Sequence, residues 1–148
     1  MARSDFSFFF PFRVRYSEVD GQMIVFNAHY LTYFDSAITE YFRALPYDYR
    51  EQLEKCGEDF HTVKTVVEYS APITFDQIIE VGVRTARIGR SSLTFALEIH
   101  PEGEESCLAS GEVVWVNTDV NSHRSAPVQE ELVGKLRALD GDSMAAAS

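Results

Sequence analysis

Cysteine and histidine are scarce in this chain. The two cysteines, Cys56 and Cys107, have no metal-binding or redox spacing. The four histidines include no pair four residues apart, the spacing that places two zinc ligands on one helix face. We therefore expect no metal site, and two free thiols are typical of a cytoplasmic protein.

Positive charge is also scarce. Thirteen lysines and arginines stand against 23 aspartates and glutamates, so the formal net charge is −10 and the pI is about 4.8. Nucleic-acid phosphates bind to basic faces, and this composition argues against such a partner. No apolar run approaches the length that spans a bilayer. The phenylalanine-rich run 6–12 is not followed by a small-residue cleavage site, so we interpret it as a strand rather than a signal peptide.

Several familiar catalytic motifs are missing. The chain has no G-x-S-x-G nucleophile motif and no glycine-rich phosphate loop of the Walker or dinucleotide type. The segment Gly89–Ser92 lacks a second glycine and follows a predicted strand, so we interpret it as a hairpin turn. We therefore expect no cofactor of its own.

The hydrophobic pattern predicts one α+β domain over residues 1–140, followed by an alanine- and serine-rich tail, 141–148, that we expect to be disordered. Alternation of apolar residues over 6–16 predicts a first strand. Apolar residues then recur every three or four positions from Ala28 to Leu45, which predicts one long helix that Pro46 ends. A short helical turn is possible in the polar stretch 48–59.

Four further strands follow in the pattern. Alternating residues predict them over 63–69, 79–85, 93–99 and 113–116, and short connections indicate antiparallel neighbours. Spacing over 128–139 predicts a C-terminal amphipathic helix, with Ser125 as a candidate cap. A long helix with one apolar stripe must bury it, and a sheet curled around the helix is one way to do so.

The richest stretch is Arg13-Val-Arg-Tyr-Ser-Glu-Val-Asp20, followed by Met23-Ile-Val-Phe-Asn-Ala-His-Tyr30. It indicates a strand, an irregular segment carrying one acid, and a helix start. Backbone N–H groups at a helix N-terminus lack partners and favour negative charge. An acid beside them pairs a proton acceptor with an anion-stabilising site, which suits acyl transfer. By itself, Asp20-Gly21 is also a common turn pair, and an aspartate before a helix is often its cap.

This stretch resembles the hotdog-fold acyl-CoA thioesterases of the 4-hydroxybenzoyl-CoA thioesterase type. The block Val67-Glu-Tyr-Ser-Ala-Pro72 and the turn Ile88–Ser92 also match, so the similarity covers roughly residues 12 to 117. The resemblance implies an antiparallel sheet wrapped around one long central helix. It also implies hydrolysis of an acyl-CoA thioester to a free acid and coenzyme A, with coenzyme A present only as part of the substrate.

The resemblance assigns roles to individual residues. Asp20 falls at the position of the catalytic carboxylate, as a general base toward water or as a nucleophile that forms a mixed anhydride. The backbone N–H of Asn27 matches the donor that stabilises the oxyanion. Phe26 and Tyr30 are candidates for the acyl pocket, although much of the aromatic set at helical spacing must be core.

Two positions depart from the family pattern. Many relatives have glycine where this chain has Met23, and we expect Met23 to narrow the substrate pocket or change the turn. Some relatives have histidine at the Asn27 position, and the Asn27 side chain cannot shuttle a proton. His29, two residues away on the helix, is more plausible as an interface or surface residue than as a catalytic one.

Coenzyme A recognition needs cations on an otherwise acidic chain. Arg90 and Ser91, in the turn that matches the family, are our candidate contacts to the nucleotide, against the alternative that they are simply solvated. A single unit of this fold leaves a sheet edge open, so we expect a homodimer or homotetramer. A non-catalytic acyl-CoA-binding module and a thioesterase acting on acyl-carrier-protein substrates are the alternatives.

Overall fold

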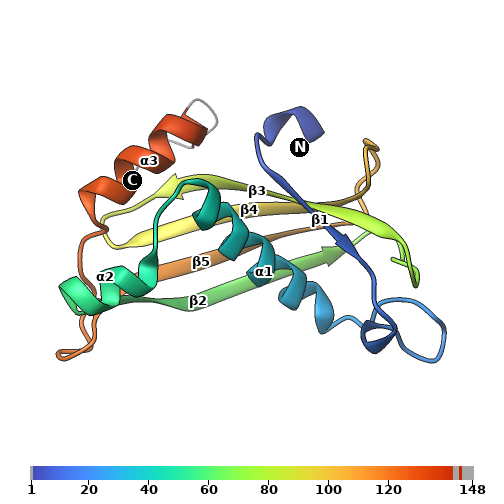
Figure 1. Cartoon of the computed structure of the whole chain (residues 1–148), viewed down its shortest axis with the longest axis horizontal. Helices are drawn as coiled ribbons and strands as arrows, with labels where there is room; N and C mark the ends of the chain where they lie inside the picture. Colours follow the sequence, from blue (N-terminus) through green and yellow to red (C-terminus); the bar gives the residue numbers. More distant parts are fainter. Residues whose placement is uncertain (1, 142–143, 145–148) are drawn as a thin grey trace.

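The computed structural model describes residues 2–141 and 144, and its centre is one five-stranded antiparallel sheet that curls around a long helix (Figure 1). The strands lie in the order β1-β3-β4-β5-β2. Their bounds are β1 Phe9–Arg13, β2 Glu58–Tyr69, β3 Ile78–Ile88, β4 Ser92–Pro101 and β5 Ala109–Asp119. The helices are α1 His29–Ala44, α2 Tyr49–Cys56 and α3 Glu130–Asp140, and short 3₁₀ turns span Arg3–Asp5 (η1) and Tyr16–Glu18 (η2).

Helix α1 is the core of the molecule, as the apolar spacing predicted. Its stripe is fully buried against the sheet and comprises Tyr30, Tyr33, Phe34, Ala37, Ile38, Tyr41 and Phe42. Phe34 packs so close to β5 that a Cβ on Gly111 would lie 2.4 Å from its ring, so only glycine fits there. The wrapped sheet and central helix implied by the family resemblance are confirmed.

The expectation that the strand at 63–69 pairs with the strand at 79–85 is wrong. Strand β2 pairs with β5 at the far edge of the sheet, and β3 lies between β1 and β4. The connection 70–77 therefore crosses the sheet instead of forming a hairpin. Strand β2 also begins five residues earlier than predicted. A register shift between Thr62 and Lys64 interrupts its alternation, and Val63, expected on the same face as Val67, is 60% exposed.

The first strand is shorter than the phenylalanine alternation suggested. Strand β1 covers only Phe9–Arg13, and η1 and η2 flank it. Tyr16, which the pattern placed on the apolar face, is 73% exposed because η2 has already changed the direction of the chain. The backbone thus leaves the sheet before the motif that carries the acid.

The C-terminal helix is present, but its expected cap is not. Helix α3 begins after Gln129, whereas Ser125 forms an isolated bridge with Thr118. At the end of α3, the buried Asp140 accepts a hydrogen bond from the Thr85 backbone N–H (3.0 Å) and another from the Tyr41 hydroxyl, which ties α3 to β3 and α1. The tail expected over 141–148 lies, apart from residues 141 and 144, outside the described residues. Among the described residues, no helix is both long enough and apolar enough to cross a bilayer.

Candidate active site

The segment between β1 and α1 is anchored by a buried carboxylate. Glu18 is 4% exposed and accepts hydrogen bonds from the Tyr33 hydroxyl (2.9 Å) and from the Arg15 backbone N–H (2.9 Å). The Arg15 guanidinium forms an ion pair with it at 2.6 Å. Burial alone would raise the pKa of Glu18, but the Arg15 and Tyr33 hydrogen bonds and the Arg15 charge together outweigh it and hold that pKa below its usual value.

Asp20 lies in a tight turn within this segment. Its backbone carbonyl accepts from the Met23 N–H (2.9 Å), and its Oδ1 accepts from the Gln22 N–H (2.8 Å). A bridge between Val19 and Val25 closes the small hairpin. Asp20 is therefore a turn residue, as one of the two sequence interpretations held. It is not the cap of α1, because Ala28 occupies that position and no side chain caps the helix.

The N-terminus of α1 lies beside this turn. The Phe26 N–H donates to the Glu18 carbonyl (2.9 Å), and the Tyr30 N–H donates to the Asn27 carbonyl (3.3 Å). Within the part of the chain that the structure describes, nothing accepts a hydrogen bond from the Asn27 backbone N–H. An unoccupied donor at the positive end of a helix dipole is a ready site for a developing oxyanion.

A cavity of about 430 Å³ brings the acid and the helix start together. Four of the predicted site residues line it, namely Asp20, Phe26, Asn27 and Tyr30, together with Ile24, Val25, Tyr69, Ser70, Ala71 and Pro72. Phe26 is 49% exposed, whereas Tyr30 is buried, and burial raises the pKa of its phenol. Tyr69 was not nominated from the sequence, although it lies in the block that matched the family.

Tyr69 completes the aromatic wall of the cavity. Its ring lies edge-on to Tyr30, with centroids 4.7 Å apart, and its hydroxyl donates to the Asn27 carbonyl at 3.2 Å. Tyr69 ends β2 at the sheet edge, and sequence order gives no sign that this edge lies over the start of α1. The contact therefore depends on the long-range pairing of β2 with β5.

Met23 is not among the residues that line this cavity. Its backbone instead has φ = 63°, in the left-handed region that favours glycine. The Met23 carbonyl accepts from the Phe75 N–H (3.0 Å), which links the turn to the crossing segment 70–77. Met23 thus holds a backbone conformation that glycine adopts more readily, at the position where many relatives have glycine.

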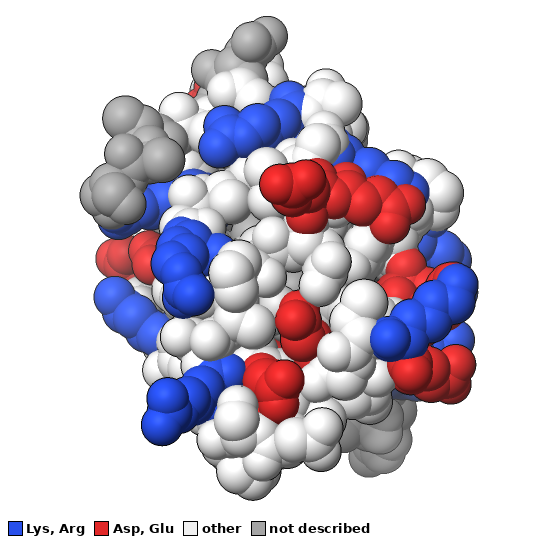
Figure 2. All heavy atoms as spheres, turned by 90° about the vertical axis from the view of Figure 1, so that its left-hand side faces the viewer, with Lys and Arg blue, Asp and Glu red and all other residues white. Residues whose placement is uncertain are grey.

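Arg90 and Ser91 lie at the other end of the sheet. They form the β3–β4 turn, whereas the Asp20 segment adjoins the opposite end of β3, where Arg13 pairs with Ile78 (Figure 1). The structure does not bring them to the Asp20 cavity within one chain. Figure 2 views the end that holds this turn, where basic and acidic side chains are interspersed. Arg90 is exposed and has no ion-pair partner among the described residues.

A larger hollow of about 500 Å³ lies between the C-terminal end of α1 and α2. Two acids line it. The Asp48 side chain caps α2, because it accepts from the Arg50 N–H (2.9 Å) and the Glu51 N–H (3.4 Å), and Glu51 forms an ion pair with Lys55. This hollow pairs no acid with an unoccupied helix N-terminus. The smaller Asp20 cavity therefore has the better chemistry for acyl transfer.

His29 does not join the acid. It is the first residue of α1, its ring lies 6.3 Å from that of Phe26, and it is not among the residues lining the cavity. The structure gives it no contact with Asp20, in line with the interpretation of His29 as an interface or surface residue.

Comparison with known proteins agrees with this geometry. The sequence model described as the thioesterase-like superfamily matches residues 14–136. An acyl-CoA thioesterase, YbgC, of Haemophilus influenzae is 29% identical over 91 residues, which cover 62% of this chain and 67% of that protein. The acyl-CoA thioester hydrolase YbgC of Escherichia coli O6:H1 is 26% identical over 130 residues, covering 88% and 96% respectively.

Solved structures extend the likeness to the whole chain. The PA5185 protein of Pseudomonas aeruginosa PAO1 superposes with a TM-score of 0.83 and 29% identity, covering 99% of this chain and 98% of that one. The family match spans the acid-bearing turn, the start of α1 and the complete sheet from β2 to β5. The chain therefore belongs to the thioesterase-like superfamily.

Proposed function

We propose that this protein hydrolyses acyl-CoA thioesters, with Asp20 as the catalytic carboxylate and the Asn27 backbone N–H as the oxyanion donor. One observation carries the proposal: a single cavity is lined both by Asp20 and by the helix start at which the Asn27 N–H has no acceptor among the described residues. The names of the YbgC relatives support the same reaction class.

The chemistry follows from where charge develops. The thioester carbonyl oxygen accepts a hydrogen bond from the Asn27 N–H, and the α1 dipole stabilises the negative charge that forms on it. In one route Asp20 takes a proton from water, whose oxygen attacks the carbonyl carbon. The C–S bond then breaks, and the coenzyme A thiolate leaves and takes up a proton. The reaction needs no cofactor beyond the coenzyme A of the substrate.

In the second route Asp20 attacks the carbonyl carbon itself. The C–S bond breaks to give a mixed anhydride between Asp20 and the acyl group, and water then hydrolyses it to the free acid and the restored carboxylate. The Gln22 N–H holds the Oδ1 of Asp20 (2.8 Å), which restricts the rotation of the carboxylate in either route.

The acyl group would lie against the aromatic wall of Phe26, Tyr30 and Tyr69. This wall is apolar and partly exposed, which suits an aromatic or branched acyl group as well as a short chain. A panel of aromatic, branched and short acyl-CoAs distinguishes these substrate classes.

A homodimer would bring Arg90 and Ser91 to the substrate. Strand β2 is a twelve-residue edge with mostly exposed side chains, and antiparallel pairing of two copies along it would place the Glu58 end of one beside the Tyr69 end of the other. The turn with Arg90 in one copy would then approach the Asp20 cavity of its partner, where its guanidinium can bind coenzyme A phosphates. A tetramer would pair two such dimers.

A non-catalytic acyl-CoA-binding module is the second candidate. It is favoured by the use of Asp20 Oδ1 in the turn and by the Asn27 side chain, which cannot shuttle a proton. A third candidate, action on acyl-carrier-protein substrates, is less suited to a chain of net charge −10 because that partner is acidic. Acyl-CoA chemistry and the two free cysteines support a cytoplasmic location.

The experiment is thiol release from aromatic, short, branched and long acyl-CoAs, run beside equilibrium binding of the same compounds. Turnover of at least one thioester above the uncatalysed rate supports the hydrolase. Binding without turnover across the panel would replace it with the binding module. The same acyl groups on acyl-carrier protein are assayed in parallel, and turnover confined to them would change the substrate class.

A further inference from the structure

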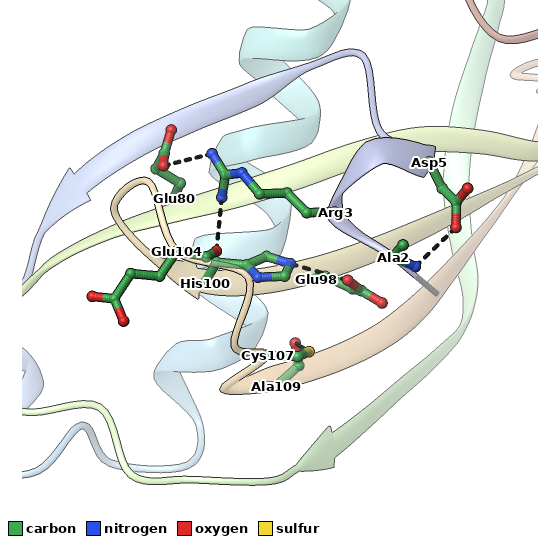
Figure 3. A network of polar contacts seen from close by, with 9 residues as sticks. All are labelled: Ala2, Arg3, Asp5, Glu80, Glu98, His100, Glu104, Cys107 and Ala109. Atoms are coloured by element: carbon green, nitrogen blue, oxygen red, sulfur yellow. Dashed lines mark hydrogen bonds and ion pairs between the residues drawn. The ribbon is translucent and has the colours of Figure 1, made fainter.

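Three potential metal ligands that are unremarkable in the sequence meet on the outer face of the sheet. Glu98 and His100 come from β4, and Cys107 comes from the loop between β4 and β5 (Figure 3). One donor atom from each lies within 4.8 Å of the other two. We call these three residues the outer cluster.

The outer cluster is separate from the Asp20 cavity. Leu97 and Ile99 belong to the core, so their neighbours Glu98 and His100 point to the other side of the strand, away from α1. The N-terminal segment covers them there: the Phe9 ring meets the His100 ring edge-on, with centroids 6.0 Å apart. His100 is 1% exposed and Glu98 6% exposed.

The N-terminal segment that covers the cluster is itself held in place by the contacts of Arg3. The Arg3 guanidinium lies over the Phe9 ring, 4.1 Å from its centroid, and forms an ion pair with Glu80 at 2.8 Å. Arg3 also donates to the Glu104 carbonyl (3.3 Å) in the β4–β5 loop (Figure 3). The surroundings of the outer cluster are thus built by three separate parts of the chain.

One buried nitrogen in the cluster has no partner. The His100 Nε2 lies 3.0 Å from a Glu98 carboxylate oxygen, and its Nδ1 is buried without a hydrogen bond among the described residues. Buried polar atoms are nearly always satisfied, so an unpartnered ring nitrogen on a histidine of this cluster points to a missing group. Imidazole, thiolate and carboxylate are the ligand types that zinc uses.

We propose that Glu98, His100 and Cys107 bind a thiophilic divalent cation, Zn²⁺ in particular, at a site distinct from the catalytic cavity. Zinc bonds of about 2.0–2.3 Å place tetrahedral donors roughly 3.3–3.7 Å apart, so closing the cluster needs contractions of about 1 Å. Mg²⁺ and Ca²⁺ prefer six or more oxygen ligands, whereas this cluster offers one carboxylate. Three protein donors leave a position for water.

Metal binding would fasten the β4–β5 loop to β4. The cation replaces the thiol proton of Cys107, an S–Zn bond forms, and one proton is released to solvent. Affinity should therefore rise with pH.

The test uses the whole 148-residue chain, stripped with a chelator and titrated with Co²⁺ and then Zn²⁺. We expect one equivalent of Co²⁺ per chain, with a thiolate-to-cobalt charge-transfer band that Zn²⁺ abolishes. Cys107→Ser should remove the band and weaken Zn²⁺ binding at least about hundredfold. The matched control, Cys56→Ser, alters the other free and exposed thiol and should change neither readout.

The metal-binding test is independent of catalysis, and folding is checked separately. Circular dichroism verifies that each variant is folded, and Glu98→Gln provides a second ligand variant that should also weaken Zn²⁺ binding. None of these readouts depends on thioester hydrolysis, so the site can fail while the proposed function stands. Absence of stoichiometric binding to the wild type, or equal Zn²⁺ affinity in wild type and Cys107→Ser, overturns the proposal.

Discussion

The Tyr33 hydroxyl of α1 donates a 2.9 Å hydrogen bond to the buried carboxylate of Glu18, two residues before Asp20. This bond joins the two halves of the candidate site, because Glu18 belongs to the segment that carries the acid and Tyr33 to the helix whose start offers the oxyanion donor. The Glu18 carbonyl also receives the Phe26 N–H next to Asn27. The relative placement of Asp20 and Asn27 thus depends on Glu18.

Tyr33→Phe should lower both the stability of the protein and its rate of thioester hydrolysis. The variant leaves one buried carboxylate oxygen with only its Arg15 backbone partner, and such a loss costs about 1–3 kcal/mol. Urea unfolding measures the change in stability. The value of kcat shows whether the loss of the hydrogen bond affects catalysis by Asp20. Tyr16→Phe is the control, because Tyr16 is 73% exposed, and no change in either value is expected. Equal stability of Tyr33→Phe and wild type would show that the Tyr33–Glu18 hydrogen bond does not stabilise the protein.

Acid should weaken the contribution of Glu18. Its pKa in the folded state is lowered, so the stabilisation is fully present above the pKa of an unfolded glutamate, about 4.3, and is lost as pH falls through the lower folded value. Unfolding free energies of wild type and Glu18→Gln should therefore differ most at neutral pH and converge in acid. A difference that stays constant from pH 7 to pH 3 would contradict this assignment.

Met23→Gly should relieve backbone strain without opening the pocket. Glycine adopts φ = 63° freely, whereas alanine does not, so Met23→Gly should be more stable than Met23→Ala by about 1 kcal/mol. Thermal unfolding of the pair measures this. Because Met23 does not line the cavity, the acyl-chain preference should be unchanged. A broader substrate range in Met23→Gly would show that the side chain reaches the bound substrate.

Arg90→Ala should raise KM for acyl-CoA with little change in kcat, because a phosphate contact far from the reacting carbon contributes to binding alone. A thioester of pantetheine, which lacks the nucleotide, should be hydrolysed equally by wild type and by Arg90→Ala.

Analytical ultracentrifugation should give a mass at least twice the 16.8 kDa of one chain. A monomer with full activity would exclude the partner's Arg90 from the site.

The sequence predicted those parts of the fold that local pattern controls. Helix α1 begins and ends within a residue of the expected bounds, because three- and four-residue spacing and Pro46 are local signals. Strand β2 was harder, since the irregularity at Thr62 and Lys64 breaks its period. Its true partner, β5, also lies far along the chain, from Tyr69 opposite Ala109 to Glu58 opposite Asp119. Local alternation carries no information about such a partner.

The same division applies to the sites. Asp20 and Asn27 are seven residues apart, the family resemblance nominated both, and the structure places both in the lining of one cavity. Tyr69 reaches them only through the sheet edge and was missed. The outer cluster was also missed, because Glu98 and His100 alternate along a strand and Cys107 follows after a loop, a spacing unlike the helical zinc motifs sought in the sequence.

The most direct measurement is the turnover number of Asp20→Asn beside Asp119→Asn on the best acyl-CoA of the panel. Asparagine keeps the Oδ1 that accepts from Gln22, so the turn should persist while the acid is lost. Asp119 holds the same kind of turn at the end of β5, through the Asn121 and Ser122 N–H groups, and provides a matched control. We expect Asp20→Asn to lower kcat by about a hundredfold to ten-thousandfold and Asp119→Asn to leave it unchanged. Equal turnover by Asp20→Asn and wild type would contradict catalysis by Asp20.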